Sequence, residues 1–153
     1  MLICSLIFFY IAEEIGYANW MPTYAYKAGI GSQETASSLA SIFWIVNTTS
    51  RILFLFWKQS SEGKLRRVLY LLVASTLLVF IMQFMGWYIL VAYLGVISSA
   101  FCLSAMYALF YGISIEKGYK LTPSNTANFT MASSLGEGLL VMPIGYAMNW
   151  FGI

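Results

Sequence analysis

The stretch F8-F-Y-I-A-E-E-I-G-Y-A-N-W-M-P-T-Y24 places two adjacent glutamates, Glu13 and Glu14, in the middle of an apolar run. The run from Leu2 to Tyr26 has the length of a membrane-spanning helix, since a helix rises about 1.5 Å per residue across a hydrocarbon core of about 30 Å. A charged carboxylate at mid-depth costs on the order of 3 kcal/mol. A sequence that keeps two such groups usually supplies a partner, a proton or a water-filled cavity, and this indicates a transport protein.

The composition indicates a membrane protein as well. The chain of 153 residues is 60% hydrophobic and 9% charged, with a mean hydropathy of +0.76, whereas about a quarter of a soluble domain is charged. The net charge of +2 is too small to predict a nucleic-acid surface. Histidine and aspartate are both absent, which excludes His-based catalytic triads, HExxH zinc sites and aspartyl dyads. We therefore expect no enzyme, no metal and no cofactor.

Five membrane-spanning helices are predicted in one domain, at about 2–26, 36–57, 68–85, 88–115 and 123–150. Ser32 or Thr35 is the expected cap of the second helix. Pro143 lies inside the last span and predicts a kink or a flexible, gating point there. The connections are short, so neighbouring helices should be antiparallel. The predicted fold class is an all-α integral membrane domain.

The basic residues predict the orientation of the chain. Six of them fall in two loops that lie on one face of a five-span domain, and the opposite face has only Lys27. By the positive-inside rule the six-charge face is cytoplasmic, so the N-terminus should be cytoplasmic and the C-terminus external. These six residues are Lys58, Lys64, Arg66, Arg67, Lys117 and Lys120.

Polar and aromatic side chains recur at helical spacing in four of the five spans, which fits a bundle around a cavity. The span at 68–85 is the plainest, with only Ser75 and Thr76 near its middle, and we expect it to face lipid. The stripes are Tyr10, Glu14, Tyr17, Met21 and Tyr24 in the first span, Trp44, Asn47, Thr48 and Arg51 in the second, and Thr130, Ser133, Ser134 and Glu137 in the fifth. The fourth carries Ser98, Ser99, Cys102, Ser104, Tyr107 and Tyr111.

Each of these features also has a structural interpretation. Serines in membrane helices often only stabilise helix packing. Arg51 lies near a helix end, where an arginine can extend toward the headgroups or cap the helix. Glu137, between two glycines, can serve as a packing hydrogen bond. Because adjacent helical positions point about 100° apart, one of Glu13 and Glu14 can be purely structural.

Three segments resemble transporters of the major facilitator superfamily. The stretch F8–Y24 looks like the seventh transmembrane segment of its fucose permease and sodium-dependent glucose transporter branch, where an aromatic run precedes a small-x-Glu-x-Gly-x-x-x-Trp-x-x-Thr-Tyr pattern. The stretch S38-L-A-S-I-F-W-I-V-N-T-T-S-R51 resembles the eighth segment, and S133-S-L-G-E-G-L-L-V-M-P-I-G145 resembles the eleventh.

The resemblance implies roles for individual residues. Glu14 takes the place of the branch glutamate, Trp20 and Tyr24 take the aromatic positions, and Arg51 takes that of the eighth-segment arginine. The whole chain would then be most of a C-terminal half of six helices. Because a complete transporter of this kind pairs two halves around a midplane site, the resemblance also implies an N-terminal half or partner subunit outside this chain.

The sequence thus favours part of a secondary transporter that moves a sugar or other small polar solute, with a proton or sodium ion, by alternating access. The rival interpretation is a non-transporting membrane protein, an accessory subunit or degenerate fragment, whose polar residues only pack helices. The expected partners are the lipid bilayer and the solute, without nucleic acid. The expected solute- or ion-binding residues are Glu14, Asn19, Trp20, Tyr24, Asn47 and Glu137, and the structural or gating residues are Glu13, Arg51 and Pro143.

Overall fold

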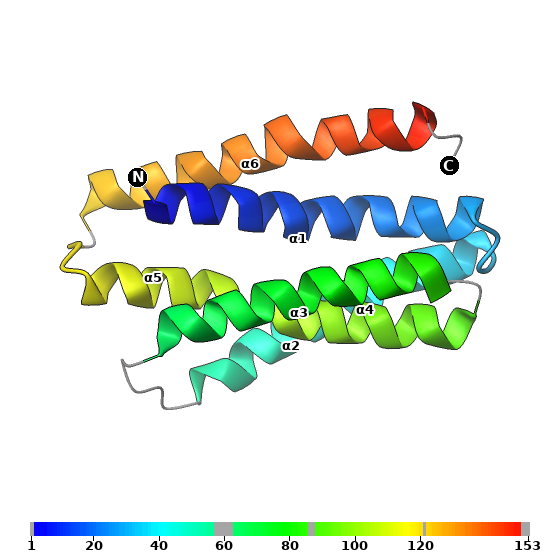
Figure 1. The fold of residues 1–153 in the computed structure, drawn as a ribbon, viewed down its shortest axis with the longest axis horizontal. Helices are drawn as coiled ribbons and strands as arrows, with labels where there is room; N and C mark the ends of the chain where they lie inside the picture. The colour runs from blue at the N-terminus through cyan, green and yellow to red at the C-terminus, as the bar shows by residue number, and fades with distance from the viewer. Residues whose placement is uncertain (1, 57–62, 86–87, 121, 151–153) are drawn as a thin grey trace.

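The computed structural model describes residues 2–56, 63–85, 88–120 and 122–150, and these ranges form α-helices without any strand. The predicted all-α class is therefore confirmed for the described residues. The helices are α1 (Leu2–Lys27), α2 (Gln33–Leu55), α3 (Lys64–Met85), α4 (Ile89–Ser104), α5 (Met106–Glu116) and α6 (Pro123–Trp150) (Figure 1).

The helix bounds follow the predicted spans closely at both ends of the chain. α6 begins at Pro123, a residue suited to a first helical turn, and it continues through Pro143. α2 begins three residues earlier than the predicted span, because Ser32 caps it: the Ser32 hydroxyl accepts a hydrogen bond of 3.3 Å from the Thr35 amide. The last residue of the predicted span 36–57 lies outside the described residues.

The predicted fourth span is interrupted at Ala105, between α4 and α5, although neither glycine nor proline occurs there. Side chains contact the backbone carbonyls at this point. The Ser104 hydroxyl donates to the Phe101 carbonyl at 2.8 Å, and the Tyr10 hydroxyl donates to the Leu103 carbonyl at 3.1 Å. Hydroxyl groups that bind helix carbonyls bend or interrupt helices, so these two contacts account for the break.

The helix α1 is the centre of the bundle, because α6 packs along one side of it and α2 along another (Figure 1). α2 and α3 both pack against α4. The approach of α6 to α1 depends on Gly136, where any Cβ would overlap the Phe8 backbone carbonyl. Tyr10 and Phe43 are among the largest side chains in the core, with 0% and 1% exposure.

One stretch of the described residues is long and apolar enough to cross a membrane. Ile89–Glu116, which comprises α4 and α5, is 28 residues long, and its hydropathy of 2.1 fits a membrane-spanning helix. The prediction of five such helices is not supported by this criterion. In α1, α2 and α6 the mean hydropathy is lowered by polar residues such as Glu13, Asn47 and Glu137, and side chains near the C-terminal end of α3 lie outside the described part.

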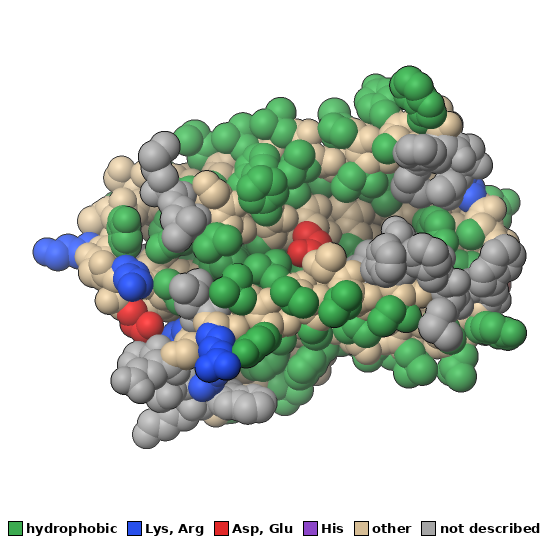
Figure 2. Space-filling view, viewed as in Figure 1, with side chains coloured by type: hydrophobic (Ala, Val, Ile, Leu, Met, Phe, Trp, Pro, Cys, Tyr) green, Lys and Arg blue, Asp and Glu red, His purple; other side chains and the backbone are tan. Residues whose placement is uncertain are grey.

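The outer surface nevertheless carries many large hydrophobic side chains, and Figure 2 shows hydrophobic side chains spread over one face of the molecule. Lys and Arg gather near one end of this view, where α3 begins and α5 ends. An ion pair between Lys64 of α3 and Glu116 of α5 joins these two helix ends. The described basic residues therefore lie near one end of the bundle, with Lys64, Arg66 and Arg67 in the first turn of α3 and Lys117 and Lys120 after α5. Lys58 lies outside the described residues, and Lys27 is the last residue of α1.

Candidate functional site

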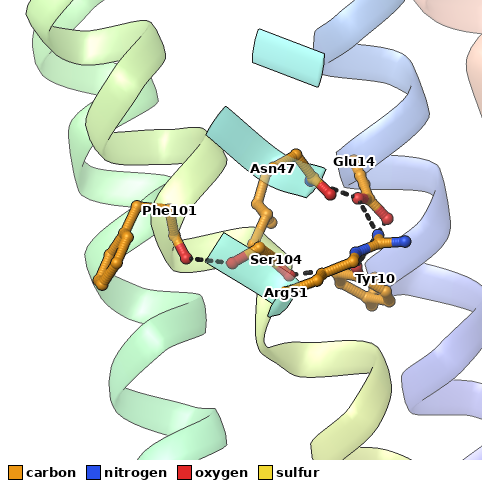
Figure 3. Close-up of polar contacts among 7 residues, drawn as sticks. Tyr10, Glu14, Asn47, Arg51, Phe101 and Ser104 are labelled. Carbon is orange, nitrogen blue, oxygen red and sulfur yellow. Dashed lines mark hydrogen bonds and ion pairs between the residues drawn. The ribbon is translucent and has the colours of Figure 1, made fainter. Parts of the chain in front are cut away.

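A buried carboxylate with three hydrogen-bond donors lies between α1 and α2 (Figure 3). Glu14 Oε1 accepts from Asn47 Nδ2 at 2.7 Å and forms an ion pair with Arg51 Nη2 at 2.6 Å. Its other oxygen, Oε2, accepts from the Tyr10 hydroxyl at 2.6 Å. We call Tyr10, Glu14, Asn47 and Arg51 the Glu14 cluster.

The cluster follows from two pairs of residues with the same spacing. Tyr10 and Glu14 are four residues apart on α1, and Asn47 and Arg51 are four residues apart on α2. Residues at this spacing lie one above the other on a helix face, so each helix presents two polar groups to its neighbour. The packing of α1 against α2 brings the two pairs together.

Burial makes these contacts energetically important. Glu14 is 2% exposed and Asn47 is 1% exposed, so water does not replace a partner that is removed. Arg51 differs, since its side chain is 45% exposed. Removing one member of a buried ion pair typically costs about 3–5 kcal/mol, because the other charge is left without compensation.

Glu13 points toward a different helix. Its carboxylate accepts hydrogen bonds from the hydroxyls of Ser75, at 3.1 Å, and Thr76, at 3.4 Å, both on α3. Ser75 is fully buried, so this side of α3 faces the protein, whereas Val73 and Leu77 are exposed. The adjacent glutamates thus contact separate helices, as their 100° separation predicts.

The Glu14 cluster borders a cavity of about 620 Å³ between α2 and α5. Arg51 lines this cavity together with Lys64, Tyr107 and Tyr111, while Glu14 does not line it. Arg51 therefore connects the buried carboxylate to a space of the size that small-molecule sites usually have, about 300–1,000 Å³.

Four of the predicted binding residues lie away from both this cavity and the Glu14 cluster. Trp20 lines a separate hollow of about 450 Å³ between α1 and α6, and its indole Nε1 donates to the Val141 carbonyl at 2.9 Å. Tyr24 is partly buried against the hydrophobic core. Asn19 and Glu137 are exposed, on α1 and α6, and neither belongs to the Glu14 cluster.

Two contacts of the Glu14 cluster were not predicted from the sequence. Arg51 was expected as a structural or gating residue, and it is the ion-pair partner of Glu14. Tyr10 was expected on the same stripe as Glu14, and that i, i+4 spacing was a signal for its hydrogen bond to the carboxylate. The spacing of Asn47 and Arg51 carried the same signal on α2.

Within the described ranges, no group of three or more His, Cys, Asp and Glu side chains is placed to hold a metal ion. Cys4 and Cys102 are free thiols, and both are partly buried. Comparisons with protein-family models, curated proteins and solved structures gave no match. The function is therefore inferred from the residues of this chain.

Proposed function

We propose that this chain is part of a secondary transporter that moves a sugar or other small polar solute across a membrane by alternating access. The observation that carries the proposal is the ion pair of Glu14 with Arg51, since Glu14 is 2% exposed inside an apolar bundle and Arg51 lines a cavity. Ionisable groups in the interior of membrane helices usually mark a solute or ion pathway. The resemblance of F8–Y24 to a transporter segment supports the same function.

In this proposal α1, α2, α3, α6 and the joined helices α4 and α5 each cross the membrane. The support is the exposed apolar surface, which includes Ile45 and Leu53 on α2, Leu69 and Val73 on α3, and Leu94 on α4. Exposed apolar side chains on several helices fit contact with lipid. The positive-inside rule then puts the N-terminus and the end bearing Lys64 in the cytoplasm.

A partner half or subunit covers the outer face of α6 in this proposal. Along α6, the residues Thr126, Thr130, Ser134 and Glu137 recur at helical spacing, and all four are exposed. α6 packs mainly against α1, which leaves this polar stripe uncovered by the described chain. A carboxylate is rarely exposed to lipid, so the stripe fits a protein partner or a shared solute pathway better than a lipid contact.

The mechanism uses competition for the Glu14 carboxylate. A proton or sodium ion that binds Glu14 weakens its attraction for Arg51, so the guanidinium is released toward the cavity. Tyr10 hydrogen-bonds both Glu14 and the Leu103 carbonyl beside the α4–α5 break. A change in the charge of Glu14 therefore reaches the α4–α5 break through Tyr10. The backbone hydrogen bonds of the helix are already interrupted at this break, so it is a suitable place for bending.

Solute uptake by cells that express the complete transporter containing this chain tests the proposal. Glu14→Gln should remove most of the uptake at equal surface expression, because the charge and the titratable group are lost while the side-chain volume is kept. Glu13→Gln is the matched control and should retain most uptake, since Glu13 contacts only the hydroxyls of Ser75 and Thr76 in the described chain. Normal uptake by Glu14→Gln would contradict the proposal.

One observation favours the rival function, a membrane protein that does not transport. Both oxygens of Glu14 are already occupied by protein donors, as expected of a purely structural cluster. The two functions differ in what a conservative change does. In the structural case Glu14→Gln lowers the unfolding free energy and leaves the activity per folded molecule unchanged, whereas in the transport case the activity per folded molecule falls.

A further inference from the structure

The cavity between α2 and α5 has a cationic lining that the proposed transport does not assign to any ligand. Its wall includes two cationic side chains, Arg51 from α2 and Lys64 from α3, and none of its described lining residues is acidic. A ligand in this cavity therefore meets two cationic side chains, each of which forms an ion pair with a carboxylate that does not line the cavity.

Each cation is held by a carboxylate that is not among the lining residues of the cavity. Glu14 holds Arg51, and Glu116 holds Lys64. The described contacts of Arg51 use only its Nη2 atom, whereas a guanidinium has five N–H donors. The carboxylates thus orient the two cations, and further donors of Arg51 remain for a ligand.

The rest of the wall combines apolar and phenolic groups. Ile52 and Leu109 are among the apolar lining residues. The hydroxyls of Tyr107 and Tyr111 lie 3.2 Å from each other, and their rings are 5.0 Å apart. Two adjacent phenols are able to donate to an anionic oxygen, while their rings and the aliphatic side chains contact an apolar body.

We propose that this cavity binds an amphipathic organic anion, with its phosphate or carboxylate head between Arg51 and Lys64 and its apolar body along Ile52 and Leu109. Two sources have this chemistry. One is an anionic phospholipid, since Lys64 begins α3 at the end of the bundle where the basic residues gather, and basic pockets between membrane helices bind such headgroups. The other is a water-soluble organic anion.

The test is a calorimetric binding titration of the purified protein in a neutral detergent. The lipid probe is dioctanoyl phosphatidic acid, with dioctanoyl phosphatidylcholine as the matched probe without net charge. The soluble probe is phenyl phosphate. Preferential binding of phosphatidic acid alone supports the site with a lipid source, and binding of phenyl phosphate supports it with a soluble source. Equal affinities for the two lipids, together with no binding of phenyl phosphate, would overturn the proposal.

Variants locate the binding in the cavity. Lys64→Gln should weaken the binding roughly tenfold, since a hydrogen bond to a charged group contributes on that scale. Arg66→Gln removes the same charge from the same helix outside the cavity lining, and it should change the affinity less than twofold. Equal weakening by both changes would show a non-specific surface effect and would contradict the proposal.

A steric variant tests the cavity without changing its charge. Ala108 is exposed and lines the cavity, so Ala108→Trp should block binding of the anionic probe while the helical circular dichroism stays unchanged. Ala127→Trp, at an exposed position of α6, is the matched control. Unchanged binding by folded Ala108→Trp would exclude this cavity. No flux is measured in these titrations, so the anion site and the proposed transport can fail separately.

Discussion

Glu14→Gln and Arg51→Gln, made separately and together, should lower the unfolding free energy by amounts that do not add. The difference from additivity is the coupling energy of the Glu14–Arg51 pair, and we expect it to be large. Glu14→Gln keeps the side-chain volume but disturbs all three hydrogen bonds: the amide oxygen accepts from Asn47 and Arg51 without its negative charge, and an NH2 group replaces the oxygen that accepts from the Tyr10 hydroxyl. Bonds to charged groups contribute about 1.5–3 kcal/mol and neutral ones about 0.5–1.5 kcal/mol, so the loss is about 1 kcal/mol for each bond and about 3 kcal/mol in total.

Arg51→Gln should also cost about 3 kcal/mol, the lower end of the range for a broken buried pair, because the Arg51 side chain is 45% exposed. The double variant leaves no uncompensated charge. Its unfolding free energy should therefore also fall by about 3 kcal/mol, since the remaining neutral groups still hydrogen-bond one another. Independent sites would give a fall of about 6 kcal/mol, so the coupling energy is about 3 kcal/mol.

The assay is reversible unfolding in mixed micelles of dodecyl maltoside and sodium dodecyl sulfate, followed by helical circular dichroism. Glu13→Gln combined with Arg51→Gln is the control cycle, because no described contact joins these two residues. The control losses should add within about 0.5 kcal/mol, as for independent sites. A coupling below about 0.5 kcal/mol between Glu14 and Arg51 would refute the reasoning.

Three further predictions concern the α1–α6 contact and the activity of the chain alone. Gly136→Ala should destabilise the protein by about 1–3 kcal/mol, since its Cβ would overlap the Phe8 carbonyl. Gly138→Ala, with nothing within 4 Å of its Cβ, should be neutral in the same unfolding assay. Trp20→Phe should cost about 1 kcal/mol through the lost hydrogen bond to the Val141 carbonyl, and an unchanged unfolding free energy would contradict this. The chain reconstituted alone should show no saturable sugar uptake, because the proposal requires a partner; saturable flux would favour a homodimeric transporter.

The helices were predictable from the sequence because their signals are local. The cap at Ser32 and the start of α6 at Pro123 depend on residues within one turn of the helix end. The break at Ala105 was not predictable, because one of its two contacts comes from Tyr10, which lies 93 residues from Leu103 in the sequence. Hydrogen bonds between distant segments leave no local pattern.

The candidate site was predictable only in part, for a related reason. Helical spacing identifies residues that share a face, and it placed Glu14 with Tyr10 and Asn47 with Arg51. It does not identify the helix that each face meets. Glu137 was therefore grouped with Glu14 among the expected solute- or ion-binding residues, whereas α6 lies on another side of α1 and Glu137 is exposed.

The most direct test of whether the chain crosses the membrane as proposed is to find the side of the membrane from which single cysteines are labelled. In a background without Cys4 and Cys102, one cysteine is placed at Ala28, Lys117 or Asn149, all exposed in the structure, and intact cells are treated with a membrane-impermeant maleimide. The account predicts labelling of Ala28→Cys and Asn149→Cys from outside, and of Lys117→Cys only after the membrane is opened. Labelling of all three from one side would contradict the membrane-spanning arrangement on which the proposed transport depends.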